Sequence, residues 1–182
     1  MKKFRTLAIV VALGVATWLG LNQLGFFTST GAQQQAQEPS QADSLALHVH
    51  KTPTCGCCSD WVTHLEKSGF EVKYTDHNSL DSIKAQYRIG ERYQSCHTGV
   101  SKNGYVFEGH VPARFIEAFL KDTPPGAIGL SVPAMPLGSP GMEYGPKFEP
   151  YQVLLLGKDG SASVYAEVTS YDQQFVASHT HH

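Results

Sequence analysis

Between residues 45 and 121, the hydrophobic pattern switches repeatedly between the period of two typical of strands and the period near 3.6 typical of helices. In chain order it predicts two strand–helix pairs, then a β-hairpin and a final helix. The expected strands are 45–50, 71–75, 98–101 and 105–108, and the expected helices are 59–69, 78–87 and 112–121. Asn103-Gly104 favours a tight hairpin turn, because both central residues of such a turn take positive φ.

This order predicts an α/β domain with a thioredoxin-like fold (β-α-β-α-β-β-α). A parallel strand pair joined by a right-handed crossover, followed by an antiparallel hairpin and a covering helix, buries both faces of one small sheet. Such a fold implies no particular activity, so function has to be argued from the site residues.

Beyond the final helix, residues 124–150 are rich in Pro and Gly and contain Met135 and Met142. A structureless stretch of this length is typical of a functional or disordered loop, and its repeated prolines restrict disorder. The alternating segments 151–156 and 161–168 then predict an extra β-hairpin that extends or covers the sheet.

The first 32 residues have the pattern of a secretory signal peptide: a basic start, an uncharged apolar run over 7–21, and small residues up to Ala32. We expect cleavage after Ala32, which leaves a periplasmic protein with no membrane segment. The alternative is an uncleaved anchor, since residues 7–27 approach the ~20 residues that span a bilayer. The Gln-rich stretch 33–44 offers almost nothing to bury, and we expect a disordered linker.

The remaining chain is acidic. Three of the 14 basic residues precede Ala32, which leaves 11 basic and 16 acidic residues, a formal charge of −5, after that position. No cluster of Lys or Arg follows Arg5, and this argues against nucleic acid or an anionic membrane as a partner. We expect one domain over residues 45–170, followed by a histidine-containing tail over 171–182.

The chain has four cysteines: Cys55, Cys57 and Cys58 directly after the first expected strand, and Cys96 before the third. The triplet falls at the start of a helix, where free N–H groups and the helix dipole stabilise thiolates. In a thioredoxin-like fold the segment before the third strand approaches that helix end. We therefore expect Cys96 to meet the triplet in space.

Three interpretations of four converging thiols are open: structural disulfides, thiol–disulfide exchange by Cys55 and Cys58, or a bound soft metal. The extra Cys57 would invite scrambling in an exchange reaction but is an asset to a metal cluster. Thiolates suit zinc, iron–sulfur clusters or Cu(I), and the thioethers of Met135 and Met142 favour copper.

Among the histidines, His97 is the candidate for a metal ligand or for a donor to one, because it adjoins Cys96. His110 follows Glu108-Gly109 at a strand end, where two roles are open: it faces the site, or it has the structural role that we expect. The terminal histidines 179, 181 and 182 either bind metal weakly or form a solvated tail.

Four motifs resemble those of the CopG-type copper-resistance proteins. They are Lys51-Thr52-Pro53-Thr54-Cys55-Gly56-Cys57-Cys58 with Trp61, Ser95-Cys96-His97-Thr98, Glu108-Gly109-His110-Val111-Pro112, and the Met-containing segment from Val132 to Glu143. The resemblance covers residues 45–168. It implies a thioredoxin-like fold, copper bound at Cys55, Cys57, Cys58 and Cys96, and a role in periplasmic copper handling.

The leading functional hypothesis is a periplasmic protein that holds Cu(I), in a cluster of several ions, on the four cysteines. Copper cycling between Cu(I) and Cu(II) would make it a copper-dependent oxidoreductase, whereas a passive chaperone or buffer needs the same ligands. A copper exporter or a periplasmic copper chaperone is the expected partner. The alternative is a metal-free thiol-disulfide oxidoreductase that uses Cys55 and Cys58.

Overall fold

The computed structural model describes residues 45–175. The expected signal peptide over 1–32, the linker over 33–44 and the three terminal histidines lie outside the described residues, so these assignments stay predictions. Within 45–175, no helix has the length and apolar character needed to cross a bilayer.

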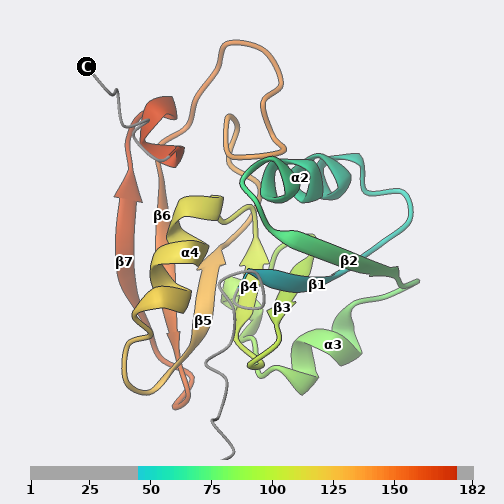
Figure 1. The fold of residues 1–182 in the computed structure, drawn as a ribbon, viewed down its shortest axis with the longest axis vertical. Coiled ribbons are helices and arrows are strands. Elements are labelled where there is room, and N and C mark those ends of the chain that lie inside the picture. The colour runs from blue at the N-terminus through green and yellow to red at the C-terminus, as the bar shows by residue number, and fades with distance from the viewer. Residues whose placement is uncertain (1–44, 176–182) are drawn as a thin grey trace, which may run out of the picture. The chain divides into compact units, whose positions relative to one another are not determined.

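The described chain forms a seven-stranded mixed sheet in the order β2-β1-β3-β4-β5-β6-β7 (Figure 1). The strands are β1 (Ala46–Lys51), β2 (Glu71–Asp76), β3 (Thr98–Ser101), β4 (Val106–Gly109), β5 (Ala127–Val132), β6 (Tyr151–Gly157) and β7 (Ala162–Val168). The β1–β2 and β4–β5 pairs are parallel, and the other four pairs are antiparallel. The fold is therefore α/β with a mixed sheet.

The helices are α2 (Gly56–Lys67), α3 (Asp81–Gln86) and α4 (Ala113–Lys121), with short 3-10 turns η1 (Glu91–Tyr93) and η2 (Tyr171–Gln174). The predicted order of elements over residues 45–121 is present, although α3 is shorter than expected. The segments 151–156 and 161–168 form the β6–β7 hairpin, which extends the sheet.

The two faces of the sheet differ in what covers them. Trp61 and Leu65 of α2 and Phe119 of α4 pack with Val49 and Phe107 in the main core. Residues of opposite parity, such as Val100 and Val106, pack in a smaller cluster with Ile89, which follows α3. Because successive strand side chains point to opposite faces, α2 and α4 cover one face while the α3 segment lies on the other.

Strand β5 corrects the prediction of an irregular Pro/Gly-rich segment over 124–150. Leu130 and Val132 are fully buried, and β5 runs parallel to β4 in the interior of the sheet. At Gly129 an added Cβ would lie 1.8 Å from the Val106 carbonyl oxygen, so only glycine allows this backbone approach. The Pro- and Gly-rich connection is thereby shortened to residues 133–150.

Helix α2 begins earlier than predicted. Its N-cap is Cys55 and its first residue is Gly56, whereas Ser59 was the expected cap. The turn before it is closed by a bond from the Cys55 N–H to the Thr52 carbonyl at 3.2 Å. Cys57 and Cys58 consequently sit within the first helical turn, where backbone N–H groups lack partners inside the helix.

Candidate metal centre

The four cysteines converge at the start of α2. The Sγ atoms of Cys55, Cys57, Cys58 and Cys96 all lie within 4.8 Å of one another, as the predicted meeting of Cys96 with the triplet requires. Three sulfurs come from the N-terminal turn of the helix, and the fourth comes from the segment between η1 and β3. Helix α2 follows β1, and the Cys96 segment leads into β3. The sheet therefore fixes the positions of these two segments relative to each other.

Two of the four sulfurs are joined in this structure. Cys55 and Cys58 form a disulfide with their Cα atoms 5.3 Å apart, while Cys57 and Cys96 are free and partly exposed. The structure therefore shows the oxidised form of the site. Reduction by two electrons, which breaks the S–S bond and leaves two thiolates, is needed before all four sulfurs can act as ligands.

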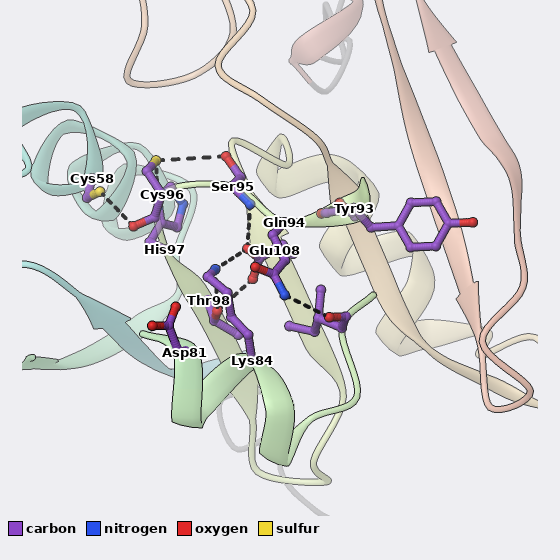
Figure 2. Close-up of polar contacts among 12 residues, drawn as sticks. Cys58, Asp81, Lys84, Tyr93, Gln94, Ser95, Cys96, His97, Thr98 and Glu108 are labelled. Atoms are coloured by element: carbon purple, nitrogen blue, oxygen red, sulfur yellow. Dashed lines mark hydrogen bonds and ion pairs between the residues drawn. The ribbon is translucent and has the colours of Figure 1, made fainter. Parts of the chain in front are cut away.

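The sulfurs differ in access. Cys58 is fully buried, and its Sγ lies 3.6 Å from the Cys96 carbonyl oxygen (Figure 2). Cys55 is partly exposed, and its Sγ lies 3.5 Å from that of Cys57. An incoming thiol or metal donor therefore reaches Cys55, Cys57 and Cys96 before Cys58.

Two imidazoles flank the Cys96 sulfur, each with a ring nitrogen 3.2 Å away: Nδ1 of His97 and Nε2 of His110. The Nδ1–H of His110 donates to the Pro140 carbonyl at 2.8 Å, an assignment that leaves the Nε2 lone pair facing the sulfur. His110 therefore faces the site, which was the alternative to the structural role that we expected. The sequence signals for this were its position at a strand end and its place in the motif from Glu108 to Pro112.

His97 is fully buried, and its ring centroid lies 4.2 Å from that of Trp61. Burial, with smaller contributions from His110 and Lys84, holds the pKa of His97 well below its usual value, so the ring is neutral. Within the described chain, its Nε2 has no hydrogen-bond partner. A buried polar atom without a partner costs about 1–3 kcal/mol, a cost that proteins commonly bear at functional sites.

The Cys96 thiol is protonated in this environment. Burial first, and then the negative charge of Cys57, raise the pKa of Cys96 to about 12. A metal ion that binds here must displace this proton, which couples binding to proton release.

A buried ion pair between Lys84 and Glu108 lies next to the Cys96 segment and is hydrogen-bonded to it. Glu108 and Lys84 are buried and paired, and Glu108 also accepts hydrogen bonds from the Ser95 N–H at 2.7 Å and from Thr98 Oγ1 at 2.6 Å (Figure 2). The carboxylate thus holds residues on both sides of Cys96. Burial raises the pKa of Glu108, while the Lys84 charge acts in the opposite direction. The sequence did not single out either partner.

The Pro- and Gly-rich connection covers the start of α2. An added Cβ at Gly141 would lie 2.6 Å from the Cys57 carbonyl oxygen and 2.7 Å from the Trp61 nitrogen. Ser95 Oγ donates to the Ala134 carbonyl, which ties the connection to the Cys96 segment as well. Met142 is buried whereas Met135 is 48% exposed, and ligation by either thioether stays a prediction.

Comparison with known proteins places this site in a wider group. A family described as "Protein of unknown function, DUF411" matches residues 93–142, which include Cys96, His97 and His110. No curated protein matches.

Two solved structures share the fold and much of the sequence. "Copper resistance protein copG- Form 1" is 42% identical with a TM-score of 0.65, and the match covers 69% of this chain and 98% of that one.

The second solved structure, "Copper resistance protein copG- Form 2", is 43% identical with a TM-score of 0.64, and the match covers 68% of this chain and 98% of that one. Identity at this level over two thirds of the chain agrees with the resemblance carried by the four motifs. This chain belongs to the CopG family of copper-resistance proteins.

Proposed function

We propose that this protein is an exported copper-binding protein that holds more than one Cu(I) ion on the thiolates of Cys55, Cys57, Cys58 and Cys96. The observation that carries the proposal is the confinement of four sulfurs within 4.8 Å at a helix N-terminus. Thiolate ligands select soft Cu(I) over harder ions, and the helix end offsets part of their negative charge.

Charge balance favours several ions over one. Four thiolates carry four negative charges, and the fully buried Cys58 and partly buried Cys96 place part of that charge away from water. Unbalanced charge in such a place is costly. Each Cu(I) removes one unit of charge, and thiolates crowded this closely can each bridge two ions. A small copper–thiolate cluster therefore fits the site better than a single copper ion.

Cys96, His97 and His110 form a second set of ligand atoms within 4.8 Å of one another. Imidazole nitrogen is a better ligand for Cu(II) than thiolates alone. We propose that this set lets one copper ion pass between Cu(I) and Cu(II), with the electron taken up by an external one-electron acceptor. This step would make the protein a copper oxidoreductase as well as a store.

The basic and apolar start of the chain supports export to the periplasm, where copper would be exchanged with an exporter or a copper chaperone. The strand order β2-β1-β3-β4, with β1 and β2 parallel, supports a thioredoxin-like core for this site. The printed names of the two solved relatives support a role in copper resistance.

An anaerobic titration tests the proposal. The protein is fully reduced and titrated with Cu(I) against a competing chelator, as wild type, as Cys96→Ser and as Thr63→Ala, an exposed control on α2. We expect more than one Cu(I) per wild-type or Thr63→Ala chain and fewer for Cys96→Ser. Unchanged stoichiometry and affinity in Cys96→Ser would exclude the four-cysteine site.

The Cys55–Cys58 disulfide favours a second candidate function, thiol–disulfide exchange. In the reduced protein the more exposed Cys55 would attack a substrate disulfide, and Cys58 would resolve the mixed disulfide. The enzyme pair is then oxidised and the substrate reduced. Reduction of insulin by the metal-free reduced protein tests this candidate. A rate no higher than that of Cys55→Ser would exclude it.

A further inference from the structure

Three histidines gather on β1 and just after β2, outside the cysteine site. His50 Nδ1 lies 2.9 Å from His77 Nε2. The ring centroid of His48 lies 4.8 Å from that of His50, and His48 Nε2 lies 2.8 Å from Thr75 Oγ1. We call His48, His50 and His77 the histidine cluster.

The sheet itself brings the cluster together. His48 and His50 alternate with the buried Leu47, Val49 and Lys51, so both point to the opposite face of β1. Parallel pairing sets His50 opposite Thr75, and the His77 N–H donates to the Lys51 carbonyl at 2.8 Å. The positions of His50 and His77 therefore follow from strand register and backbone hydrogen bonding.

Their spacing suits two ligands of one metal ion. With metal–nitrogen bonds of about 2.0 Å, neighbouring ligands in a square-planar ion lie about 2.8 Å apart, against about 3.3 Å in a tetrahedral one. The observed 2.9 Å between the two nitrogens is close to the square-planar value. In the hydrogen bond between them one of the two nitrogens carries the hydrogen, so that ring has to hold its proton on its other nitrogen before both lone pairs can turn toward a shared ion.

His48 is placed to supply a third nitrogen. Its side chain is exposed, so a change of rotamer is fast and meets little steric resistance. The movement exchanges its contact with Thr75 Oγ1 for a metal bond, while Thr75 is itself exposed and can turn to water. The fold already positions the nitrogens of His50 and His77, whereas that of His48 has to move into place. The site is therefore partly preorganised.

Three lysines near the cluster are paired with carboxylates, and Lys102 lines the same pocket as His48 and His50. Lys73, on the same face, pairs with Glu71 at 3.4 Å, and the buried Lys84 pairs with Glu108. The Lys51 ammonium pairs with Asp76 at 2.7 Å. Desolvation, followed by the charges of His48 and His77, lowers the pKa of His50, so its ring is neutral and able to ligate near pH 7.

We propose that the histidine cluster is a second metal site, which takes Cu(II) through His50 and His77 with His48 as the third ligand. Square-planar nitrogen sites suit Cu(II) and Ni(II), and of these two Cu(II) binds more tightly. The proposal is independent of copper binding by the cysteines, because it uses none of them.

The test uses the full chain carrying Cys57→Ser and Cys96→Ser, in which the Cys55–Cys58 disulfide remains and no free thiol can reduce Cu(II). One equivalent of Cu(II) is added with glycine as a competing ligand. Electron paramagnetic resonance then reports nitrogen coordination, and the competition reports affinity. The variants are His50→Gln and His77→Gln. The controls are Thr63→Ala, at an exposed position on α2, and a chain in which the three terminal histidines are Gln.

We expect a square-planar Cu(II) signal with nitrogen ligands, and at least tenfold weaker binding for His50→Gln and for His77→Gln. His77 follows the edge strand β2, so its replacement tests the site even if His50→Gln fails to fold. Circular dichroism of the metal-free variants checks folding. Unchanged binding in a folded His50→Gln or His77→Gln chain would overturn the proposal. Loss of binding on replacement of the terminal histidines would also overturn it.

Discussion

His110 Nε2 lies 3.2 Å from the Cys96 sulfur, while the opposite nitrogen of the same ring donates to the Pro140 carbonyl. The ring thus links the end of β4, the Pro- and Gly-rich connection and the Cys96 thiol. Its orientation is fixed by the Pro140 bond, so the nitrogen that faces the sulfur is the one able to accept a proton or bind a metal.

His110→Gln should weaken Cu(I) binding by about 10–100-fold without changing the number of cysteine ligands, since a group that orients or supplements a metal ligand typically has this effect. Competitive Cu(I) titration of the reduced variant measures the change. Thr63→Ala, at an exposed position on α2, is the control and should bind Cu(I) at the cysteines as wild type does. Equal affinities for wild type and His110→Gln would show that the ring plays no part.

Breaking the Lys84–Glu108 pair should destabilise the fold strongly. Glu108→Gln leaves a buried ammonium without its counter-charge, at an expected cost of about 3–5 kcal/mol in the free energy of unfolding. The double variant Glu108→Gln with Lys84→Met removes both charges and should recover part of the loss. Urea denaturation of the single and double variants checks this. Equal stabilities for Glu108→Gln and wild type would contradict the role of the pair.

Gly141→Ala should loosen the connection over the cysteine site. The new Cβ would overlap the Cys57 carbonyl and the Trp61 nitrogen at a φ of +86°, at an expected cost of about 1–3 kcal/mol. Gly145→Ala is the matched control, because Gly145 has a φ of +79° and open space around it. The difference in urea midpoint between the two variants isolates the steric contact. Equal midpoints would mean that the connection does not pack on α2.

Stability should depend on His64 between pH 7 and pH 4. Its Nε2 accepts a hydrogen bond from the Ala113 N–H at 3.1 Å at the start of α4. Burial, with a smaller effect of Lys67, lowers the pKa of His64 to about 4. In this window the unfolded chain binds the proton more readily, so stability is full above pH 6.5 and falls as the pH drops toward 4.

The His64 contribution is at most about 3 kcal/mol. His64→Gln keeps a hydrogen-bond acceptor but cannot titrate in this range, so its unfolding free energy should fall less than that of wild type between pH 7 and pH 4. Parallel pH profiles for the two proteins would refute this assignment.

Much of the site followed from local sequence rules. A strand, a tight turn and an amphipathic helix placed the cysteine triplet at a helix start, and the strand order brought Cys96 to it. The Asn103-Gly104 signal likewise located the β3–β4 hairpin, although the turn differs from the predicted one: Gly104 has a φ of +81°, whereas Asn103 does not take a positive φ. The helix start and the hairpin depend on residues close together in the chain, where periodicity and turn chemistry are informative. Cys96 lies 38 positions from Cys58, and its place beside the triplet was predicted from the expected fold.

Other features that depend on contacts between residues far apart in the chain were not predicted. Strand β5 is bounded by prolines and contains Gly129, so its local pattern resembles a loop, and only pairing with β4 makes it a strand. The Lys84–Glu108 pair joins residues 24 positions apart, and His110 lies 14 positions from Cys96. Lys and Glu side chains are usually solvent-exposed, and nothing in the local sequence indicates that Lys84 and Glu108 are buried as a pair.

Copper K-edge X-ray absorption of the reduced protein, loaded anaerobically with Cu(I), tests the central claim most directly. Four thiolates within 4.8 Å predict Cu(I) with a sulfur-dominated ligand shell and a short copper–copper distance, both diminished in Cys96→Ser. A ligand shell made mainly of nitrogen or oxygen, or a spectrum unchanged by Cys96→Ser, would contradict the proposal that these cysteines hold the copper.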